Sequence, residues 1–342
     1  MRVSISPRAL VDDLLEVSII ASFSRIGPSV RRPLFRWSPP PADALVGRTV
    51  LVTGPTSGLG RQAAQELAAL GARVVLVGRD RERLSALADS LSARHRVSRF
   101  PIVVADMTSL ASVRSATEEV IATESRLDVL IDNAGAIFRE RETSPDGIEA
   151  TFATLVVGPF SLVRGLLPLL ERTPGARVIA VTSGGQYAQS LDLDDLQSSS
   201  DPYDGTRAYA RSKRAQVTLM REWARRLGPA GIRFDSMHPG WTRTPGLAEA
   251  LPEFAHAMGP LLRSPREGTD TLMWLATTPT HPAPAGSLWL DRRPRPFDRL
   301  PGTRLTATDR RRLWDLVVRL SGLSDPGVDQ RPDLPRHSRR HR

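Results

Sequence analysis

The stretch Thr53-Gly54-Pro55-Thr56-Ser57-Gly58-Leu59-Gly60 places three glycines between an apolar segment and a helical one. A strand is expected at 49–53 and a helix at 59–70. Between a strand and a helix, glycines allow a tight turn and close approach of the backbone to a pyrophosphate at the helix N-terminus. An ordinary glycine-rich connection is the alternative. The context favours a dinucleotide site, with contacts expected from Gly54, Ser57, Gly58, Leu59 and Gly60.

From this motif onward, short apolar segments alternate with longer amphipathic ones. Strands are expected at 49–53, 73–77, 102–105, 129–131, 178–181 and 232–237. Helices are expected at 59–70, 84–93, 110–123, 147–170 and 209–227. Such alternation is typical of a parallel sheet covered on both faces by right-handed crossovers. We therefore predict an α/β fold, a Rossmann-type doubly wound parallel sheet in a single domain with an N-terminal helical extension and a C-terminal tail.

The rest of the chain is organised around that domain. Two long inserts follow strands late in the chain, where loops at the carboxyl edge of a sheet would overhang a ligand cleft. The final segment is rich in proline, arginine and histidine, which predicts disorder. The expected parts are an extension with a proline-rich linker at 1–45, the domain at 46–290 with inserts at 184–208 and 241–268, a segment at 291–324 with a helix at 308–321, and a disordered basic tail at 325–342.

The extension is predicted to hold an amphipathic helix that begins at Ser6-Pro7. Acidic residues interrupt its apolar run, which excludes a signal peptide or a membrane span there and predicts a cytoplasmic protein. Its apolar positions are Leu10, Val11, Leu14, Leu15, Ile19, Phe23 and Ile26. This face needs a partner. Its own domain or a second subunit in a homo-oligomer is favoured, and peripheral membrane contact through residues 7–36, helped by nearby arginines, is the alternative.

Composition excludes several classes of site. The chain has no cysteine, and its six histidines show no ligand-like spacing, so no metal centre is expected. The net charge of +10 resembles that of a nucleic-acid-binding protein until it is located. Residues 46–290 carry 27 basic and 26 acidic groups, whereas 291–342 carry 14 and seven. The nearly neutral body argues against a nucleic-acid partner.

Tyr209 stands four residues before Lys213, the only lysine among 47 basic residues. Positions four apart share one face of a helix, so the phenol and the ammonium can point into one site. An ammonium near a phenol favours the phenolate and brings proton transfer closer to neutral pH. An exposed helix with an incidental lysine is the alternative.

The end of the second strand, Val77-Gly78-Arg79-Asp80, bears on the choice of cofactor. An acidic residue there would accept hydrogen bonds from the adenosine ribose of NAD. Gly78 occupies the discriminating position, and Arg79 offers a fork for a 2′-phosphate. We therefore predict NADP(H) in preference to NAD(H), with Asp80 as the argument against it.

With these motifs and Asn133-Ala134-Gly135 in place, residues 46–290 resemble the short-chain dehydrogenase/reductases. Further runs resemble the subgroup of dehydrogenase/reductase member 12, which also has an N-terminal helical extension. These runs are Val181-Thr182-Ser183-Gly184-Gly185, Asp194-Asp195-Leu196-Gln197-Ser198, Asp204-Gly205-Thr206, Ser236-Met237-His238-Pro239-Gly240-Trp241 and Asp270-Thr271-Leu272-Met273-Trp274-Leu275-Ala276.

The resemblance implies a role for each matching residue. Ser183 would polarise the substrate carbonyl, Tyr209 would transfer the proton, and Lys213 would lower the pKa of Tyr209 and hold the nicotinamide ribose. The remaining cofactor contacts would come from Asp106 and Met107 at the adenine, Asn133, Ala134 and Gly135 along the cofactor, and Pro239, Gly240 and Thr244 by the carboxamide. Turn or capping roles are the alternatives for Asp106, Ser183 and the 133–135 run.

One position departs from the family pattern. Where the family has an asparagine that stabilises a helix irregularity and holds a relay water, this chain has Leu155.

The leading interpretation is an NADP-dependent oxidoreductase that acts on an apolar carbonyl or alcohol. The alternative is a nucleotide-binding sensor or scaffold with little catalysis, and the reason for considering it is Leu155.

Overall fold

A computed structural model describes residues 6–95, 100–200 and 202–325, so the predicted basic tail lies, apart from its first residue, outside the described residues. The described residues hold one sheet of eight strands in the order β3-β2-β1-β4-β5-β6-β7-β8. The strands are β1 (Thr49–Thr53), β2 (Arg73–Gly78), β3 (Ile102–Val104), β4 (Val129–Asp132), β5 (Arg177–Val181), β6 (Arg233–Met237), β7 (Leu288–Leu290) and β8 (Arg293–Arg295). All pair in parallel except β8, which is antiparallel to β7. The predicted doubly wound sheet is confirmed, with an antiparallel strand at one edge.

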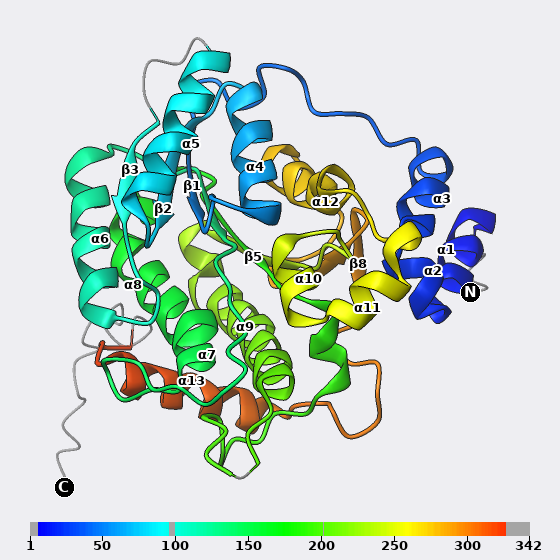
Figure 1. The fold of residues 1–342 in the computed structure, drawn as a ribbon. Helices are drawn as coiled ribbons and strands as arrows, with labels where there is room; N and C mark the ends of the chain where they lie inside the picture. The colour runs from blue at the N-terminus through cyan, green and yellow to red at the C-terminus, as the bar shows by residue number, and fades with distance from the viewer. Residues whose placement is uncertain (1–5, 96–99, 201, 326–342) are drawn as a thin grey trace, which may run out of the picture.

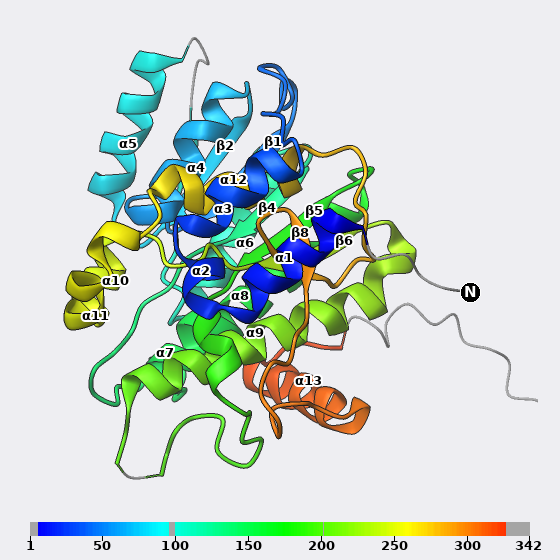
Figure 2. The same cartoon turned by 90° about the vertical axis from the view of Figure 1, so that its right-hand side faces the viewer.

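Helices cover both faces of this sheet (Figures 1 and 2). One layer consists of α4 (Gly58–Ala69), α5 (Arg81–Arg94) and α12 (Pro265–Thr277), and the other of α6 (Leu110–Thr123), α8 (Gly158–Glu171) and α9 (Gly205–Leu227). Successive strand residues face opposite layers. In β1, Val50 and Val52 belong to the core under α4, α5 and α12, whereas Leu51 belongs to the core under α6, α8 and α9.

The helix predicted at 147–170 starts later and is irregular. Glu149 caps it, and its carboxylate accepts hydrogen bonds from two backbone N–H groups of the first turn. After α7 (Ala150–Phe152) comes a π-helical turn, Ala153–Val157, and then α8. Pro159 has no N–H for the carbonyl of Leu155, and its ring clashes with that carbonyl, so the regular ladder cannot continue. The chain widens here instead, as in other π turns.

Two other predicted helices also start at different residues. α5 begins before residue 84, because the Asp80 carboxylate accepts a hydrogen bond from the Arg83 N–H and caps the helix. α9 begins before Tyr209, with Asp204 as its cap. The insert at 241–268 is largely helical, with α10 (Pro245–Ala250) and α11 (Pro252–Ala257), while the insert at 184–208 opens with a 3-10 turn, Gly184–Ala188.

The chain continues to build the same body beyond residue 290, where we expected the domain to end. β8 completes the edge of the sheet. The predicted C-terminal helix is confirmed as α13 (Ala307–Ser321). Its Trp314 is fully buried, with ring centroids 4.7 Å from Trp223 and 5.1 Å from Phe160. The segment after 290 therefore shares the core of the domain.

Within the described residues, one helical stretch is long and apolar enough to cross a membrane, Ala150–Glu171. It comprises α7, the π turn and α8. Of its most apolar window, 83% is buried inside the protein. The stretch is therefore a central core helix of the α/β fold.

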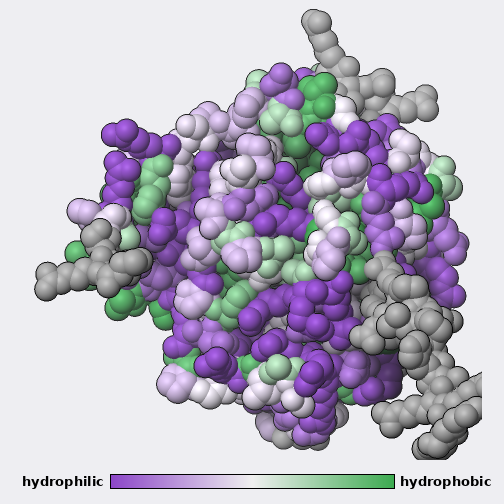
Figure 3. Space-filling model, turned by 180° about the vertical axis from the view of Figure 1, so that it is seen from behind, coloured by the Kyte–Doolittle hydropathy of each residue, from purple (hydrophilic) through white to green (hydrophobic). Residues whose placement is uncertain are grey.

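The extension forms three helices at the end of the molecule that carries β8 (Figures 1 and 2). They are α1 (Pro7–Val17), α2 (Ile19–Phe23) and α3 (Ile26–Leu34), and Ser6 caps the first as predicted. α1 is oriented opposite to our expectation, because Asp12 is 1% exposed while Leu14 is 65% and Val17 is 84% exposed. Apolar side chains gather over α1 and α2 at the left edge of Figure 3. Of the two favoured partners for this face, its own domain is therefore wrong for α1, and a second subunit stays a prediction.

Candidate active site

The glycine-rich turn leaves no room for side chains. Gly54 and Gly58 have φ of +64° and +51°, which favours glycine. A Cβ on Gly60 would lie 2.1 Å from the Gly54 carbonyl oxygen and 2.4 Å from the Asn133 amide nitrogen. The side chain of Ser57, the N-cap of α4, makes no capping hydrogen bond. The first N–H groups of α4 thus remain available to an anion.

The segment after β4 is fastened to this turn. The Asn133 side-chain amide donates to the carbonyls of Thr53 (3.0 Å) and Gly54 (3.2 Å). The Thr53 hydroxyl accepts from the backbone N–H groups of Asn133 and Ala134, both at 2.9 Å. A Cβ on Gly54 would lie 2.9 Å from Ala134 Cα. The predicted contacts after β1 and after β4 therefore form one cradle, with Gly135 exposed beside it.

Ser183, Tyr209 and Lys213 meet near the carboxyl end of β5. Ser183 follows β5, and its side chain lies beside that of Tyr209. Lys213 is 3% exposed, and its ammonium lies 5.9 Å from the Tyr209 ring centroid. Lys213 Nζ donates to the Val181 carbonyl (2.8 Å) and to Gln216 Oε1 (3.2 Å). The structure thus brings all three predicted catalytic residues together.

Burial dominates the ionisation of this cluster. It raises the pKa of Tyr209, and the neighbouring Ser183 hydroxyl opposes that shift in part. We expected Lys213 to lower this pKa, but its ammonium is bound to Val181 and Gln216. Burial also lowers the pKa of Lys213 to about 8, against the opposing pull of the Asp132 carboxylate. At neutral pH the phenol is therefore protonated and can act as an acid.

Asp106 and Met107 follow β3, at the same edge of the sheet. Asp106 Oδ1 accepts from the Thr108 N–H (2.9 Å) and hydroxyl (2.8 Å), so the carboxylate already closes a turn. The Met107 carbonyl lies 2.2 Å from where a Cβ on Gly158 would be, so α8 packs directly on this segment. The turn role, one of the two alternatives for Asp106, is therefore present in the structure.

Arg79 and Asp80 differ in how far they are already engaged. The Asp80 carboxylate caps α5. Arg79 is exposed, and among the described residues its guanidinium has no hydrogen bond or ion pair. The cation is therefore accessible at the end of β2, while the acid has a structural partner.

The loop after β6 closes the other side of the cradle. Gly240 has φ of +70° and touches Arg263 and the Phe23 carbonyl, so no side chain fits there. Pro239 is buried. The Thr244 side chain lies 3.4 Å from where a Cβ on Gly58 would be. The predicted contacts Pro239, Gly240 and Thr244 thus follow β6, and Thr244 reaches the glycine-rich turn.

Phe23 of the extension is a neighbour of the site that sequence analysis missed. Its ring lies 2.6 Å from where a Cβ on Gly184 would be, directly after Ser183. The ring also packs edge-on against His238 (4.5 Å) and Trp241 (5.9 Å). The apolar spacing marked Phe23 as a packing residue, but no local signal indicated its partners.

Leu155 lies inside the π turn and is fully buried. Its side chain is 3.2 Å from where a Cβ on Gly135 would be. The helix irregularity therefore persists without the asparagine of the family pattern, because Pro159 imposes it. Leucine supplies no polar atom at this position.

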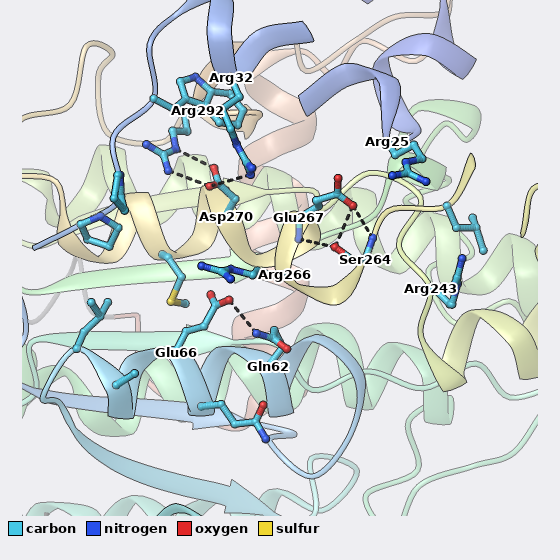
Figure 4. Close-up of a pocket in the computed structure, with 18 residues that line it drawn as sticks. Arg25, Arg32, Gln62, Glu66, Arg243, Ser264, Arg266, Glu267, Asp270 and Arg292 are labelled. Carbon is cyan, nitrogen blue, oxygen red and sulfur yellow. Dashed lines mark hydrogen bonds and ion pairs between the residues drawn. The ribbon is translucent and has the colours of Figure 1, made fainter. Parts of the chain in front are cut away.

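A cavity of about 970 Å³ lies apart from these residues, between the linker, α4 and α12 (Figure 4). At one end Arg292 forms a two-point ion pair with Asp270, and its guanidinium lies 4.9 Å from the Trp37 ring centroid. Gln62 donates to Glu66 along its floor (2.8 Å). Ser183, Tyr209 and Lys213 do not line it.

Comparisons with known proteins agree with this geometry. A family model for the short chain dehydrogenases matches residues 48–253. Human dehydrogenase/reductase SDR family member 12 is 40% identical over 249 residues, covering 72% of this chain and 78% of that protein. Human retinol dehydrogenase 14 is 33% identical over 319 residues, covering 87% of this chain and 92% of that protein.

Solved structures show the same fold. A short chain dehydrogenase from Salmonella enterica serovar Typhi superposes with a TM-score of 0.61 at 26% identity, covering 74% of this chain and 98% of that chain. A protein from Escherichia coli CFT073 complexed with NADPH superposes with a TM-score of 0.58 at 26% identity. The match covers 70% of this chain and 94% of that chain.

Proposed function

Because the chain belongs to the short-chain dehydrogenase/reductase family and is an oxidoreductase, we propose that it transfers a hydride between NADP(H) and an apolar carbonyl or alcohol. The observation that carries this proposal is the meeting of Ser183, Tyr209 and Lys213 beside a cradle that only glycine can form. The cradle fits a dinucleotide, because the glycine-rich turn packs tightly against Asn133 without side chains and the start of α4 offers N–H groups to an anion.

The three side chains divide the work at the substrate oxygen. When bound, the nicotinamide ring supplies or accepts the hydride. Ser183 donates a hydrogen bond to the oxygen, and Tyr209 gives the proton in reduction or takes it in oxidation. Lys213, whose ammonium lies 5.9 Å from the Tyr209 ring centroid, would hold the nicotinamide ribose. Since burial keeps Tyr209 protonated at neutral pH, reduction is the direction for which the site is prepared.

Three observations support NADP(H) over NAD(H). Arg79 is accessible for a 2′-phosphate, and Asp80, the acid that argued for NAD, is occupied as the cap of α5. A structural neighbour was solved with NADPH. Asp106, Met107 and the 133–135 run would line the cofactor, with Pro239, Gly240 and Thr244 on its other side.

An apolar substrate is supported by the lining of the late insert. Trp241, after β6, packs edge-on against Phe254 of α11 at 5.0 Å. Both rings remain partly exposed beside the loop that holds Pro239 and Gly240. Human retinol dehydrogenase 14, one of the relatives, is named for an apolar alcohol.

The alternative of a nucleotide sensor without catalysis loses its main support. Leu155 was its motive, yet the π turn that the missing asparagine would stabilise is present, and Lys213 has polar partners. The test is NADPH consumption by the intact protein with aliphatic, steroid-like and retinoid-like carbonyls, alongside NADPH binding. Turnover of at least one of them is expected. Tight NADPH binding without turnover of any substrate class would favour the sensor.

For the extension, we propose contact between a membrane surface and a protein that is otherwise cytoplasmic. The carboxylates of Asp12 and Glu16 in α1 face arginines inside, and the aliphatic face of the helix points outward with α2. Exposed apolar residues of the two helices are Leu10, Val11, Leu14, Val17, Ile19 and Ile20. The exposed Arg8, Arg25, Arg32 and Arg36 add positive charge that suits anionic lipid.

Sedimentation with phosphatidylserine-containing vesicles tests this surface. Replacing Leu14 and Val17 by glutamine should reduce the bound fraction, whereas Leu300→Gln, at another exposed apolar position, should not. Equal binding of all variants would refute membrane contact. If the variant with glutamine at positions 14 and 17 instead had a changed oligomeric mass, the apolar face of α1 would belong to a homo-oligomer interface.

A further inference from the structure

A buried polar chain leads from the predicted catalytic lysine to the end of β4. Lys213 Nζ donates to Gln216 Oε1 at 3.2 Å, and Gln216 Nε2 donates to Asp132 Oδ2 at 2.7 Å. Lys213, Gln216 and Asp132 are 3%, 4% and 3% exposed. We refer to these three residues as the lysine chain. Asp132 directly precedes Asn133 of the cofactor cradle, so the chain connects both halves of the site.

The donors and acceptors of the lysine chain fit in only one orientation. An ammonium only donates, and an ionised carboxylate only accepts. The Gln216 amide therefore turns its oxygen to Lys213 and its nitrogen to Asp132. A protonated Asp132 could donate instead, and the amide would lose the partner that fixes its orientation.

The far end of the lysine chain opens into a small cavity beside the π turn. Asp132, Gln216 and Leu155 line this space, which has a volume of about 20 Å³. Asp132 Oδ1 has no hydrogen-bond partner among the described residues. A volume of this size holds about one water molecule. Leu155 contributes only apolar atoms, so the polar side of the cavity comes from Asp132 and Gln216.

The charges of the chain are coupled through this arrangement. Burial raises the pKa of Asp132 to about 6, with Lys213 and Gln216 opposing the shift. Burial lowers the pKa of Lys213 to about 8, and Asp132 is the charged group that opposes it. Tyr209, on the same helix, is the other titratable neighbour of Lys213. Near pH 7 the two ends of the chain thus carry opposite charges.

We propose that Asp132, acting through Gln216, is the positioning residue and counter-charge of Lys213, and that it takes the place of the polar group missing at Leu155. Its catalytic consequence rests on the proposed function, whereas its effect on the lysine does not. The carboxylate keeps the lysine protonated, and the amide keeps it directed toward Val181 and the site. The tether would thereby compensate for the departure at Leu155.

The single lysine allows a direct test without substrate. Protein labelled with ¹⁵N at the lysine side chain gives one ammonium signal, that of Lys213. In Asp132→Asn, Lys213 should titrate at lower pH, by on the order of one pH unit, because an opposite charge is lost. Gln216→Leu removes the amide between Lys213 and Asp132 but keeps the carboxylate. In this variant the titration of Lys213 should shift less than in Asp132→Asn, and its signal should broaden. An unchanged titration in Asp132→Asn overturns the proposal.

Asp235→Asn is the matched control. Asp235 is also buried on a strand, and burial likewise raises its pKa to about 6, but its partners are Arg233, Trp289 and Ser287. This variant should leave the Lys213 titration unchanged while losing stability. A shift of equal size in both variants would assign the effect to general loosening and refute a specific counter-charge.

Turnover provides the second readout. At about pH 9, where most of Lys213 is deprotonated in the parent, Asp132→Asn should lower kcat by up to roughly tenfold, the factor for one pH unit in a single ionisation. Gln216→Leu, which keeps the carboxylate, should lower kcat less, and NADPH affinity should change little in both variants. If the lysine chain takes the place of the family's asparagine, adding Leu155→Asn to Gln216→Leu should restore part of kcat. A double variant with no restored kcat would contradict this part of the proposal. Absence of turnover in the parent protein would refute the proposed function, yet the lysine titration would still decide the inference.

Discussion

Two buried groups of charges differ in how completely their carboxylates are satisfied. In the extension network, Asp12 and Asp291 bind Arg31, Arg263 and Arg295, and every carboxylate oxygen has an arginine partner. In the lysine chain, one oxygen of Asp132 has no partner. Burial acts to raise the pKa of all three acids. The arginines nevertheless hold the pKa values of Asp12 and Asp291 below their ordinary values, whereas the pKa of Asp132 remains raised.

The difference indicates separate tasks. A network whose carboxylate oxygens are all paired fixes one arrangement, and here it fastens α1 and α3 to the turn that holds Asp291. Arg263 also donates to the Phe23 carbonyl (3.0 Å), so this anchor supports a wall beside Ser183. An incompletely satisfied group with a shifted pKa is more typical of a functional site. We expect substitutions in the first group to affect folding and those around the second to affect chemistry.

The largest effect is expected at the chemical end. Tyr209→Phe keeps the ring but removes the hydroxyl, so turnover should fall by roughly 10²–10⁴ while NADPH still binds. Lys213→Arg should weaken both turnover and NADPH affinity, because a planar guanidinium cannot replace a compact ammonium. Steady-state kinetics and nucleotide titration measure both. A Tyr209→Phe variant as active as the parent would remove the catalytic assignment.

Breaking the extension network should mainly cost stability. Asp291→Asn leaves Arg31 and Arg263 without their shared counter-charge, which should lower the free energy of unfolding by roughly 3–5 kcal/mol. Asp13→Asn, at an exposed position of α1, is the control and should change little. Urea unfolding followed by circular dichroism measures both. A loss for Asp291→Asn no larger than for the control would show that the network does not fasten the extension.

Sequence analysis located the parts of the site that depend on local pattern. The glycine-rich turn and the Tyr209/Lys213 pair were located from period and turn chemistry, because these determine strand ends and helix faces. Ser183 came from the resemblance to the family. Gln216, three residues after Lys213, and Asp132, next to Asn133, could have been found from the same helix face and strand end. Their partnership needed the fold, since they are far apart in the chain.

Long-range contacts account for what the sequence could not predict. Periodicity gives α1 an apolar stripe, but Asp12 faces inward because Arg295, distant in sequence, lies beneath it. Sequence analysis predicted one helix at 147–170, and only the structure shows the π turn at Ala153–Val157 within it. The last two strands, β7 and β8, were missed because each is three residues long.

A smaller effect is expected from replacing the exposed Arg79 than from breaking the buried arginine network of the extension. Arg79→Ala removes an exposed guanidinium that has no structural partner among the described residues, so stability should hardly change. The preference for NADPH over NADH should narrow by roughly 1–3 kcal/mol, the range for a charge-assisted contact. Binding titrations with both nucleotides measure it. Equal affinity of the parent protein for the two would contradict the assignment of Arg79.

The smallest effect concerns pH, where the two groups should have opposite slopes. The folded pKa of Asp132, about 6, lies above its unfolded value near 4, so its contribution to stability is present below pH 4 and is lost as pH rises to 6. The folded pKa of Asp291 is lowered, so its contribution is present above pH 4 and is lost in acid. Relative to the parent, Asp132→Asn should gain about 1 kcal/mol of stability per pH unit between pH 4 and 6, and Asp291→Asn should show no such gain there. Urea unfolding at several pH values gives both slopes, and parallel slopes would mean that the two groups of charges are electrostatically alike.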